Sequence, residues 1–109
     1  MSVEIQTEER DGIAIVSLAG ELDLPGSIKA AGELAIAEEK EPEVLVLDLR
    51  DLDFIDSSGI QMIVTADQRA RRSGRRLALV RGPDQVHRVF TMMRLDEELE
   101  LVEDLSQLP

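Results

Sequence analysis

The sequence contains no cysteine, which excludes disulfide bonds, thiol chemistry and cysteine-ligated metal sites. A single histidine, His87, cannot form a histidine-rich metal site. A Ser-His catalytic pair is not expected either, since His87 lies far along the chain from the candidate serine, Ser57. Phe54 and Phe90 are the only aromatic residues, so the core must be built from aliphatic side chains, methionine and alanine. No apolar run approaches membrane-spanning length, and the N-terminus lacks the basic and apolar segments of a signal peptide. These absences favour a soluble cytoplasmic protein with no cofactor and no membrane insertion.

Basic residues are scarce too, because 23 acidic side chains face 12 basic ones and give a net charge of −11. Phosphates would be repelled at long range, so nucleic acid is not expected as a direct partner. The local exception is a cluster of five arginines: Arg69, Arg71, Arg72, Arg75 and Arg76. Cations at the end of a predicted helix complement its dipole, and a patch for an acidic partner or a nucleotide phosphate is the alternative.

The length of 109 residues suits one α/β domain spanning residues 1–109. Hydrophobic patterning predicts the element order β-β-α-β-α-β-α-β. The strands are expected at residues 3–6, 13–19, 44–49, 77–80 and 99–102. The helices are expected at 25–39, at 60–72 and after Gly82-Pro83, and Gly74 is expected to end the second helix in a left-handed conformation. The last residues, 103–109, are interpreted as a polar tail.

Turn residues and connections predict how these elements are arranged. Asp11-Gly12 favours a tight hairpin, so the first two strands should be antiparallel. The later strand–helix–strand segments require parallel strands and right-handed crossovers, which gives a mixed sheet with helices mainly on one face. The buried face of the first helix is expected to consist of Ile28, Ala31, Leu34, Ala35 and Ala37.

Polar residues follow two strands that this arrangement makes parallel neighbours. Glu21-Leu22-Asp23 follows the second strand, and Asp56-Ser57-Ser58-Gly59 follows the third. Because the turns after parallel strands emerge at one end of the sheet, the two segments should meet on one surface. Ser57 and Ser58 would lie at a helix N-terminus, where free N–H groups favour an oxygen or an anion. The simpler interpretation is that one of these serines caps the helix.

These segments resemble the two signatures of the anti-sigma factor antagonists, the single-domain bacterial members of the STAS group. The first is Gly20-Glu21-Leu22-Asp23, and the second runs from Leu52 to Ile60 and contains Asp56-Ser57-Ser58-Gly59. The resemblance extends from about Val3 to Val102. It implies a STAS-type mixed sheet with the order of elements predicted above.

The resemblance also implies that the protein is a regulator and not an enzyme. Its unmodified form would bind an anti-sigma factor that is itself a serine kinase of the GHKL type, which would free a sigma factor for transcription. The kinase would phosphorylate Ser57, and a PP2C-type phosphatase would reverse the modification. The implied partner-binding residues are Glu21, Asp23, Asp56, Ser57, Ser58, Gly59 and Ile60.

Two positions depart from the family pattern. Gln61 and Met62 stand where a small residue commonly follows the serine–glycine element, which leaves the identity of the partner open. Met93-Arg94-Leu95 lacks the glycine that ends the third helix in many relatives. Either Arg94 adopts a left-handed conformation at some cost, or the helix ends differently.

Other functions fit the residues less well. A receiver domain would use the carboxylates between Asp48 and Asp56 with Mg²⁺, but the only lysines, Lys29 and Lys40, lie in or just after the first helix. That acidic run is therefore interpreted as solvated loop residues. A serine hydrolase would need a nucleophile elbow and a base, and Ser57 has neither. The remaining alternative is another STAS role, as a scaffold of a stress-signalling assembly or an accessory of a lipid or anion transporter.

Overall fold

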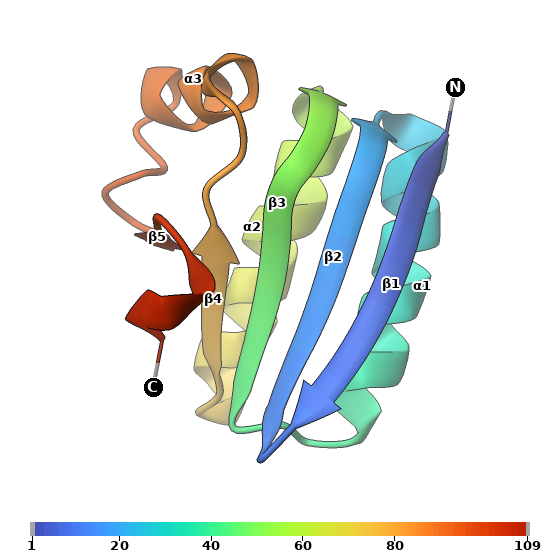
Figure 1. The fold of residues 1–109 in the computed structure, drawn as a ribbon, viewed down its shortest axis with the longest axis vertical. Helices are drawn as coiled ribbons and strands as arrows, with labels where there is room; N and C mark the ends of the chain where they lie inside the picture. Colours follow the sequence, from blue (N-terminus) through green and yellow to red (C-terminus); the bar gives the residue numbers. More distant parts are fainter. Residues whose placement is uncertain (1, 109) are drawn as a thin grey trace.

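The computed structural model describes residues 2–108, which form a five-stranded mixed sheet with three α-helices (Figure 1). The strands are β1 (Val3–Arg10), β2 (Ile13–Leu22), β3 (Val44–Ile55), β4 (Arg76–Val80) and β5 (Glu100–Val102). The helices are α1 (Leu24–Glu39), α2 (Ser57–Ser73) and α3 (Asp84–Met92), and a short 3-10 helix, η1 (Leu105–Gln107), follows β5. The strands lie in the order β1-β2-β3-β4-β5, which confirms the predicted α/β fold class and element order.

The hairpin of β1 and β2 confirms the predicted turn. Asp11 and Gly12 both have positive φ, 48° and 81°, as a two-residue turn that follows the twist of the sheet requires. β1 extends to Arg10, beyond its predicted end at Gln6, because its antiparallel pairing with β2 continues up to the turn. The later pairs, from β2–β3 to β4–β5, are parallel as predicted.

β2 does not end at Gly20, as the sequence suggested, but continues to Leu22. The register with β3 shifts on both sides of this glycine, and at each shift the extra residue lies in β3, so β2 continues its pairing instead of stopping. Gly20 has φ 97°, and a side chain there would collide with the backbone carbonyl of Ser2. This continued pairing places Leu22 beside Ile55, the last residue of β3.

β3 is twelve residues long and is twice the predicted length. In its second half Leu52 and Ile55 are buried, whereas Asp51 and Asp53 are exposed. The interpretation of the acidic run as a loop is therefore wrong, because Asp48, Asp51 and Asp53 all lie in a strand. Asp51 and Asp53 are on its exposed side, whereas Asp48 is buried and bound by Arg50. The alternation of buried and exposed residues suits a strand that covers the core on one side only.

α1 and α2 cover one face of the sheet, the far face in Figure 1, and the main core lies between helices and strands. The core is almost wholly aliphatic, as predicted, and Phe90 is its largest fully buried side chain. α1 turns Ala30, Leu34 and Ala37 toward this core, while Ile28 is 67% exposed. The predicted buried face of α1 is thus wrong at Ile28 and at Ala35, which are both exposed, because the helix turns Ala30 toward the sheet instead.

On the opposite face of the sheet the C-terminal segment covers only a part, next to β4 in Figure 1. Leu105 and Leu108 pack there against a second apolar cluster, formed by Ile15, Val44, Val46 and Val80. The segment after Glu103 is therefore more than a polar tail. Its two leucines hold η1 against the sheet, since apolar side chains gain from leaving water.

The ends of α2 and α3 share one geometry. Gly74 has φ 73° after α2, where the sequence predicted a left-handed residue. Arg94, which follows the C-cap Met93 of α3, is also left-handed, with φ 58°. The Arg94 N–H donates to the Thr91 carbonyl (3.0 Å), and the Leu95 N–H donates to the Phe90 carbonyl (2.9 Å). The first of the two possibilities for Arg94 is therefore confirmed, and two backbone hydrogen bonds offset the cost of its conformation.

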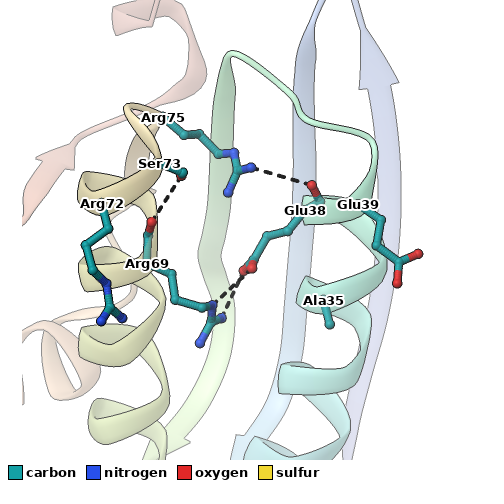
Figure 2. Close-up of a pocket in the computed structure, with 7 residues that line it drawn as sticks. All are labelled: Ala35, Glu38, Glu39, Arg69, Arg72, Ser73 and Arg75. Atoms are coloured by element: carbon teal, nitrogen blue, oxygen red, sulfur yellow. Dashed lines mark hydrogen bonds and ion pairs between the residues drawn. The ribbon is translucent and has the colours of Figure 1, made fainter.

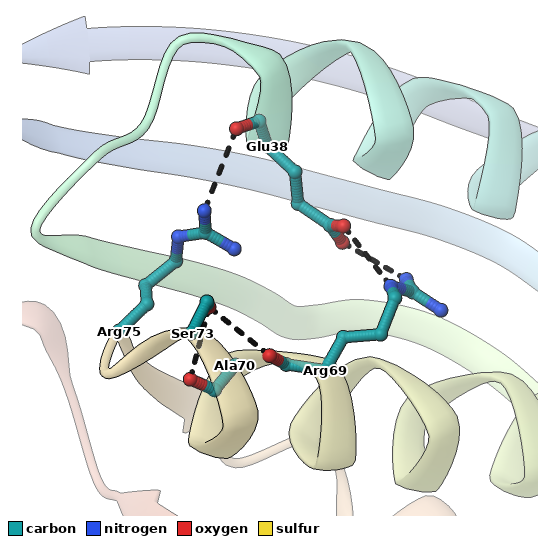
Figure 3. A network of polar contacts seen from close by, with 5 residues as sticks. All are labelled: Glu38, Arg69, Ala70, Ser73 and Arg75. Carbon is teal, nitrogen blue, oxygen red and sulfur yellow. Dashed lines mark hydrogen bonds and ion pairs between the residues drawn. The ribbon is translucent and has the colours of Figure 1, made fainter.

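The arginine cluster joins the C-terminal ends of α1 and α2 (Figures 2 and 3). Arg69 donates two hydrogen bonds to the Glu38 carboxylate, at 3.0 and 2.9 Å. Arg75 donates to the backbone carbonyls of Pro42 and Glu38, at 3.3 and 3.5 Å. Arg72 is exposed and makes no ion pair with any residue between 2 and 108. Part of the cluster is therefore structural, and Arg72 keeps its guanidinium available.

Candidate partner-binding site at the carboxyl ends of β2 and β3

The register of β2 and β3 places the two polar segments side by side. Glu21 pairs with Phe54, and Leu22 pairs with Ile55. The Asp56 N–H then donates to the Leu22 carbonyl (3.3 Å), which continues the pairing into the two strand–helix junctions. The predicted meeting of these segments at one end of the sheet is confirmed, and Figure 1 shows the ends of β2 and β3 adjacent at its top.

Asp56 is the N-cap of α2, so the interpretation of Ser57 or Ser58 as the cap is wrong. Its Oδ1 accepts hydrogen bonds from the backbone N–H of Ser58 (2.9 Å) and of Gly59 (3.3 Å). The Ser58 hydroxyl donates to the same oxygen. These hydrogen bonds, that of the Ser58 hydroxyl first, hold the pKa of Asp56 below its ordinary value, so the cap is a carboxylate at neutral pH.

Ser57 and Ser58 differ in their surroundings although they are neighbours in the sequence. Ser57 is the first residue of α2 and is exposed. Its hydroxyl makes no hydrogen bond to any residue from 2 to 108, whereas the half-buried Ser58 hydroxyl is bound to Asp56. Ser57 therefore presents the accessible hydroxyl of the pair.

Gly59 and Ile60 lie below this surface and are buried. A Cβ on Gly59 would lie 2.8 Å from the Leu22 carbonyl oxygen and 2.8 Å from Cγ1 of Ile55. Only glycine therefore allows α2 to begin so close to β2 and β3. Ile60 belongs to the main core and is 3% exposed. These two residues shape the site without offering a side chain to a partner.

Asp23 caps α1 in the way that Asp56 caps α2. Its Oδ1 accepts a hydrogen bond from the Gly26 N–H (2.9 Å), and its backbone carbonyl accepts one from the Ser27 hydroxyl (2.7 Å). Asp23 and Glu21 are both half-buried. Because each capping aspartate uses Oδ1, its Oδ2 is left without a hydrogen bond from the described residues 2–108. The surface beside Ser57 is therefore strongly acidic.

The sequence did not point to an apolar groove that lies beside these junctions, between α1 and α2. It encloses about 310 Å³. Its lining residues are Leu24, Ser27, Ile28, Ala31, Ser58, Gln61, Met62, Thr65 and Arg69. Leu24 and Ile28 are 60% and 67% exposed. Leu24 and Ile28 are four residues apart and lie on a different face of α1 from Ala30, Leu34 and Ala37. This spacing could have indicated the groove, since a helix with two apolar faces packs only one of them on the sheet.

Other kinds of site find little support in the described chain. None of the helices between Ser2 and Leu108 has the length and apolar character needed to cross a bilayer. Over the same residues, no three His, Asp or Glu side chains gather closely enough to hold a metal ion.

Known proteins resemble this chain over almost its whole length. The sequence profile of the STAS domain matches residues 4–108. An anti-sigma-B factor antagonist of Listeria monocytogenes is 30% identical over 102 residues, which cover 93% of this chain and 90% of the relative. An anti-sigma F factor antagonist of Paenibacillus polymyxa is 32% identical over 96 residues, which cover 87% of this chain and 82% of the relative.

A solved structure shows the same fold. The crystal structure of an anti-sigma factor antagonist from Mycobacterium paratuberculosis matches with a TM-score of 0.87 at 21% identity, over 96% of this chain and 89% of that one. The profile match and the two relatives extend this likeness to the sequence. The chain therefore belongs to the STAS domain family, in its group of anti-sigma factor antagonists, which are regulatory proteins and not enzymes.

Proposed function

We propose that the protein acts in the cytoplasm as a phosphorylation-controlled anti-sigma factor antagonist. Its unmodified form binds an anti-sigma factor that is also a GHKL-type serine kinase, and the sigma factor is released. Phosphorylation of Ser57 prevents binding, and a PP2C-type phosphatase restores it. The contact surface consists of Glu21, Asp23, Asp56, Ser57 and Ser58, supported from below by Gly59 and Ile60.

The observation that carries the proposal is the exposed, unbound hydroxyl of Ser57 beside two capping carboxylates. A kinase needs an accessible hydroxyl, and Ser58 is half-buried with its hydroxyl held by Asp56. A partner that packs on this surface would cover Ser57 directly. Modification of one side chain can then change the affinity without any change of fold.

The switch follows from local electrostatics. A phosphate on Ser57 adds about −1.5 to −2 charges and three acceptor oxygens. The nearest helical N–H groups, those of Ser58 and Gly59, are already bound by Asp56, so the phosphate cannot use them without displacing the cap. The phosphate would remain hydrated next to the Asp56 carboxylate. A partner whose surface fits the neutral Ser57 hydroxyl would have to remove this water on binding, which costs free energy. We expect the affinity to fall at least about tenfold, or about 1.4 kcal/mol.

The test uses the GHKL-type kinases of the source bacterium, purified individually and incubated with the protein and ATP. Peptide mass spectrometry should find phosphate on Ser57 in the wild type and in Ser58→Ala, but none in Ser57→Ala. Phosphate on Ser58 with Ser57 unmodified would contradict the assignment. If no kinase of this type binds or modifies the protein, another STAS role, as a scaffold or a transporter accessory, replaces the proposal.

Calorimetry with the same kinase measures the switch. Ser57→Asp should bind at least about tenfold more weakly than the wild type. Gln85→Glu adds the same charge to an exposed position of α3 and should bind normally. Amide NMR shifts of the phosphorylated protein should change only near Asp23 and residues 56–62. Changes spread over the sheet and α3 would mean that the switch is a conformational change.

A further inference from the structure

We infer that the groove between α1 and α2 receives an amphipathic helix of the anti-sigma factor. The identity of this partner rests on the proposed function, whereas the groove itself is a feature of the fold. Apolar side chains of the incoming helix would contact Leu24 and Ile28 on α1 and Met62 on α2. A carboxylate near one of its ends would pair with Arg72.

The groove is hollow because small side chains line it where two helices meet. Ser27 and Ala31 on α1 face Ser58 and Thr65 on α2, and none of these is large enough to fill the space between the helix axes. The Arg69–Glu38 ion pair crosses from one helix to the other and closes the far end of the groove (Figure 2). From Ser58 to Arg69, α2 rises about 16 Å, which is the length of a three-turn helix.

The apolar character of the groove favours a protein segment as its occupant. Leu24 and Ile28 expose most of their surface and form its rim, and Met62 is half-buried beside them. An apolar stripe of this kind suits a helix that inserts residues spaced i, i+3 or i+4, and i+7. Methionine adapts its shape to such insertions. The surface gains when it is covered, because its apolar side chains are removed from water.

The two ends of the groove carry opposite charges, which sets the direction of the occupant. Glu21, Asp23 and Asp56 lie at the end beside Ser57. The other end of the groove is marked by Arg69, which is paired with Glu38. Arg72 lies just beyond it, in a neighbouring hollow that Glu39 also lines, and it makes no ion pair within residues 2–108 (Figure 2). The incoming helix therefore carries a basic side chain near Asp56 and an acidic one near Arg72.

The groove is continuous with the surface proposed for kinase contact, because Ser58 belongs to both. One partner can therefore cover Ser57 and fill the groove at once. A second copy of this chain is a less suitable occupant, since each copy brings a net charge of −11 and long-range repulsion with it.

The experiment measures affinity for the purified GHKL-type kinase that distinguishes the wild type from Ser57→Asp. Leu24→Ala/Ile28→Ala should bind at least about tenfold more weakly. The matched control is Ile36→Ala, which removes an equally exposed apolar side chain of α1 (54%) outside the groove and should bind normally. Thermal unfolding of all variants checks that these surface changes leave the fold intact.

A second pair of variants tests the direction of the occupant. Arg72→Glu should bind about threefold or more weakly, and the loss should shrink as salt screens the interaction. Arg88→Glu makes the same change at an exposed position of α3 and should have no effect. If the kinase binds Leu24→Ala/Ile28→Ala and Arg72→Glu like the wild type but still binds Ser57→Asp weakly, the groove is not the binding site. The proposed function would be unaffected by that result.

The remaining outcomes are equally decisive. If no kinase distinguishes the wild type from Ser57→Asp, the proposed function fails, and the groove loses the partner assigned to it. If sedimentation velocity shows a dimer of the wild type that Leu24→Ala/Ile28→Ala dissociates, the occupant is a second copy of this chain and the proposal is wrong.

Discussion

The two strand–helix junctions of this protein are built on one plan and differ in what they expose. After β2 the chain reads Asp23-Leu24-Pro25-Gly26, and after β3 it reads Asp56-Ser57-Ser58-Gly59. In both, an aspartate caps the helix and a glycine follows three residues later. A Cβ on Gly26 would lie 2.6 Å from the Glu21 carbonyl oxygen, much as one on Gly59 would meet that of Leu22 at 2.8 Å.

The difference lies in the serines. Ser27, after the first junction, is buried and donates its hydroxyl to the Asp23 carbonyl. Ser57, inside the second junction, is exposed and leaves its hydroxyl unbound within residues 2–108. The aspartate and the glycine therefore fix the backbone of each junction. The position of the serine decides whether its hydroxyl is used within the fold or is exposed.

The largest expected effect comes from the shared glycines. Gly59→Ala and Gly26→Ala should each destabilise the protein by about 1–3 kcal/mol, because the new methyl group meets a backbone carbonyl that cannot move away. Gly32→Ala is the control, since nothing lies within 4 Å of its Cβ position, and it should stabilise α1 by up to about 1 kcal/mol. Urea unfolding measures all three. Equal stability of Gly59→Ala and Gly32→Ala would show that the junction is not tightly packed.

Loss of either capping aspartate should lower the free energy of unfolding by about the same amount, whereas the effects on kinase affinity should differ. Asp23→Ala and Asp56→Ala should each cost about 1 kcal/mol, as loss of an N-cap usually does. Asp23→Asn keeps the cap, so a lower affinity of this variant for the kinase would report the carboxylate alone. We expect Asp23→Ala to weaken kinase binding by about 1–3 kcal/mol in calorimetry. An unchanged affinity with the fold intact would remove Asp23 from the contact surface.

Substitution of the serine at each junction should affect stability differently, because only one of the two hydroxyls is buried and hydrogen-bonded. Ser27→Ala should lower the free energy of unfolding by about 0.5–1.5 kcal/mol, because a buried hydrogen bond is lost. Ser57→Ala should change stability by less than about 0.5 kcal/mol, since its hydroxyl is exposed and unbound. Both values come from the same urea experiment. A stability loss at Ser57 as large as that at Ser27 would mean that the Ser57 hydroxyl has a structural role.

The smallest expected effect is a pH dependence at the second junction. The pKa of Asp56 is lowered by its hydrogen bonds, that of the Ser58 hydroxyl first. Its contribution to stability is therefore present above the ordinary aspartate pKa of about 3.9 and is lost as the pH falls through the lower folded value. Ser58→Ala should raise the pKa of Asp56 toward the ordinary value, as an NMR titration of the carboxyl carbon would show. No change in that titration would contradict the role given to Ser58.

Local patterns in the sequence were sufficient for most of the fold. The positive-φ turn at Asp11-Gly12, the helix end at Gly74 and the parallel crossovers follow from rules that act over a few residues or on chain direction. The same rules placed Asp23 and Asp56 on one surface, because parallel strands end at one edge of a sheet. The choice of Ser57 over Ser58 as phosphoacceptor came from family resemblance and stays a prediction.

Several errors in the prediction arose where packing between distant segments overrides local pattern. The second half of β3 looked like an acidic loop, yet its pairing with β2 makes it a strand. Asp56 and not a serine caps α2, because the extended backbone of β3 continues through Asp56 and the helix begins at Ser57. Ile28 looked like a core residue, but the small residues of α1 face the sheet instead.

The sequence by itself determined the order of the elements, the aliphatic core and the acidic character of the chain. Turn residues, hydrophobic spacing and charge act locally, so they can be read without knowing what lies across the fold. Only the tertiary structure decided which of Ser57 and Ser58 binds Asp56, which arginines of the cluster are held by carboxylates or carbonyls, and where a groove opens. Those properties depend on the neighbours that segments far apart in the chain bring together, and periodicity carries no information about such neighbours.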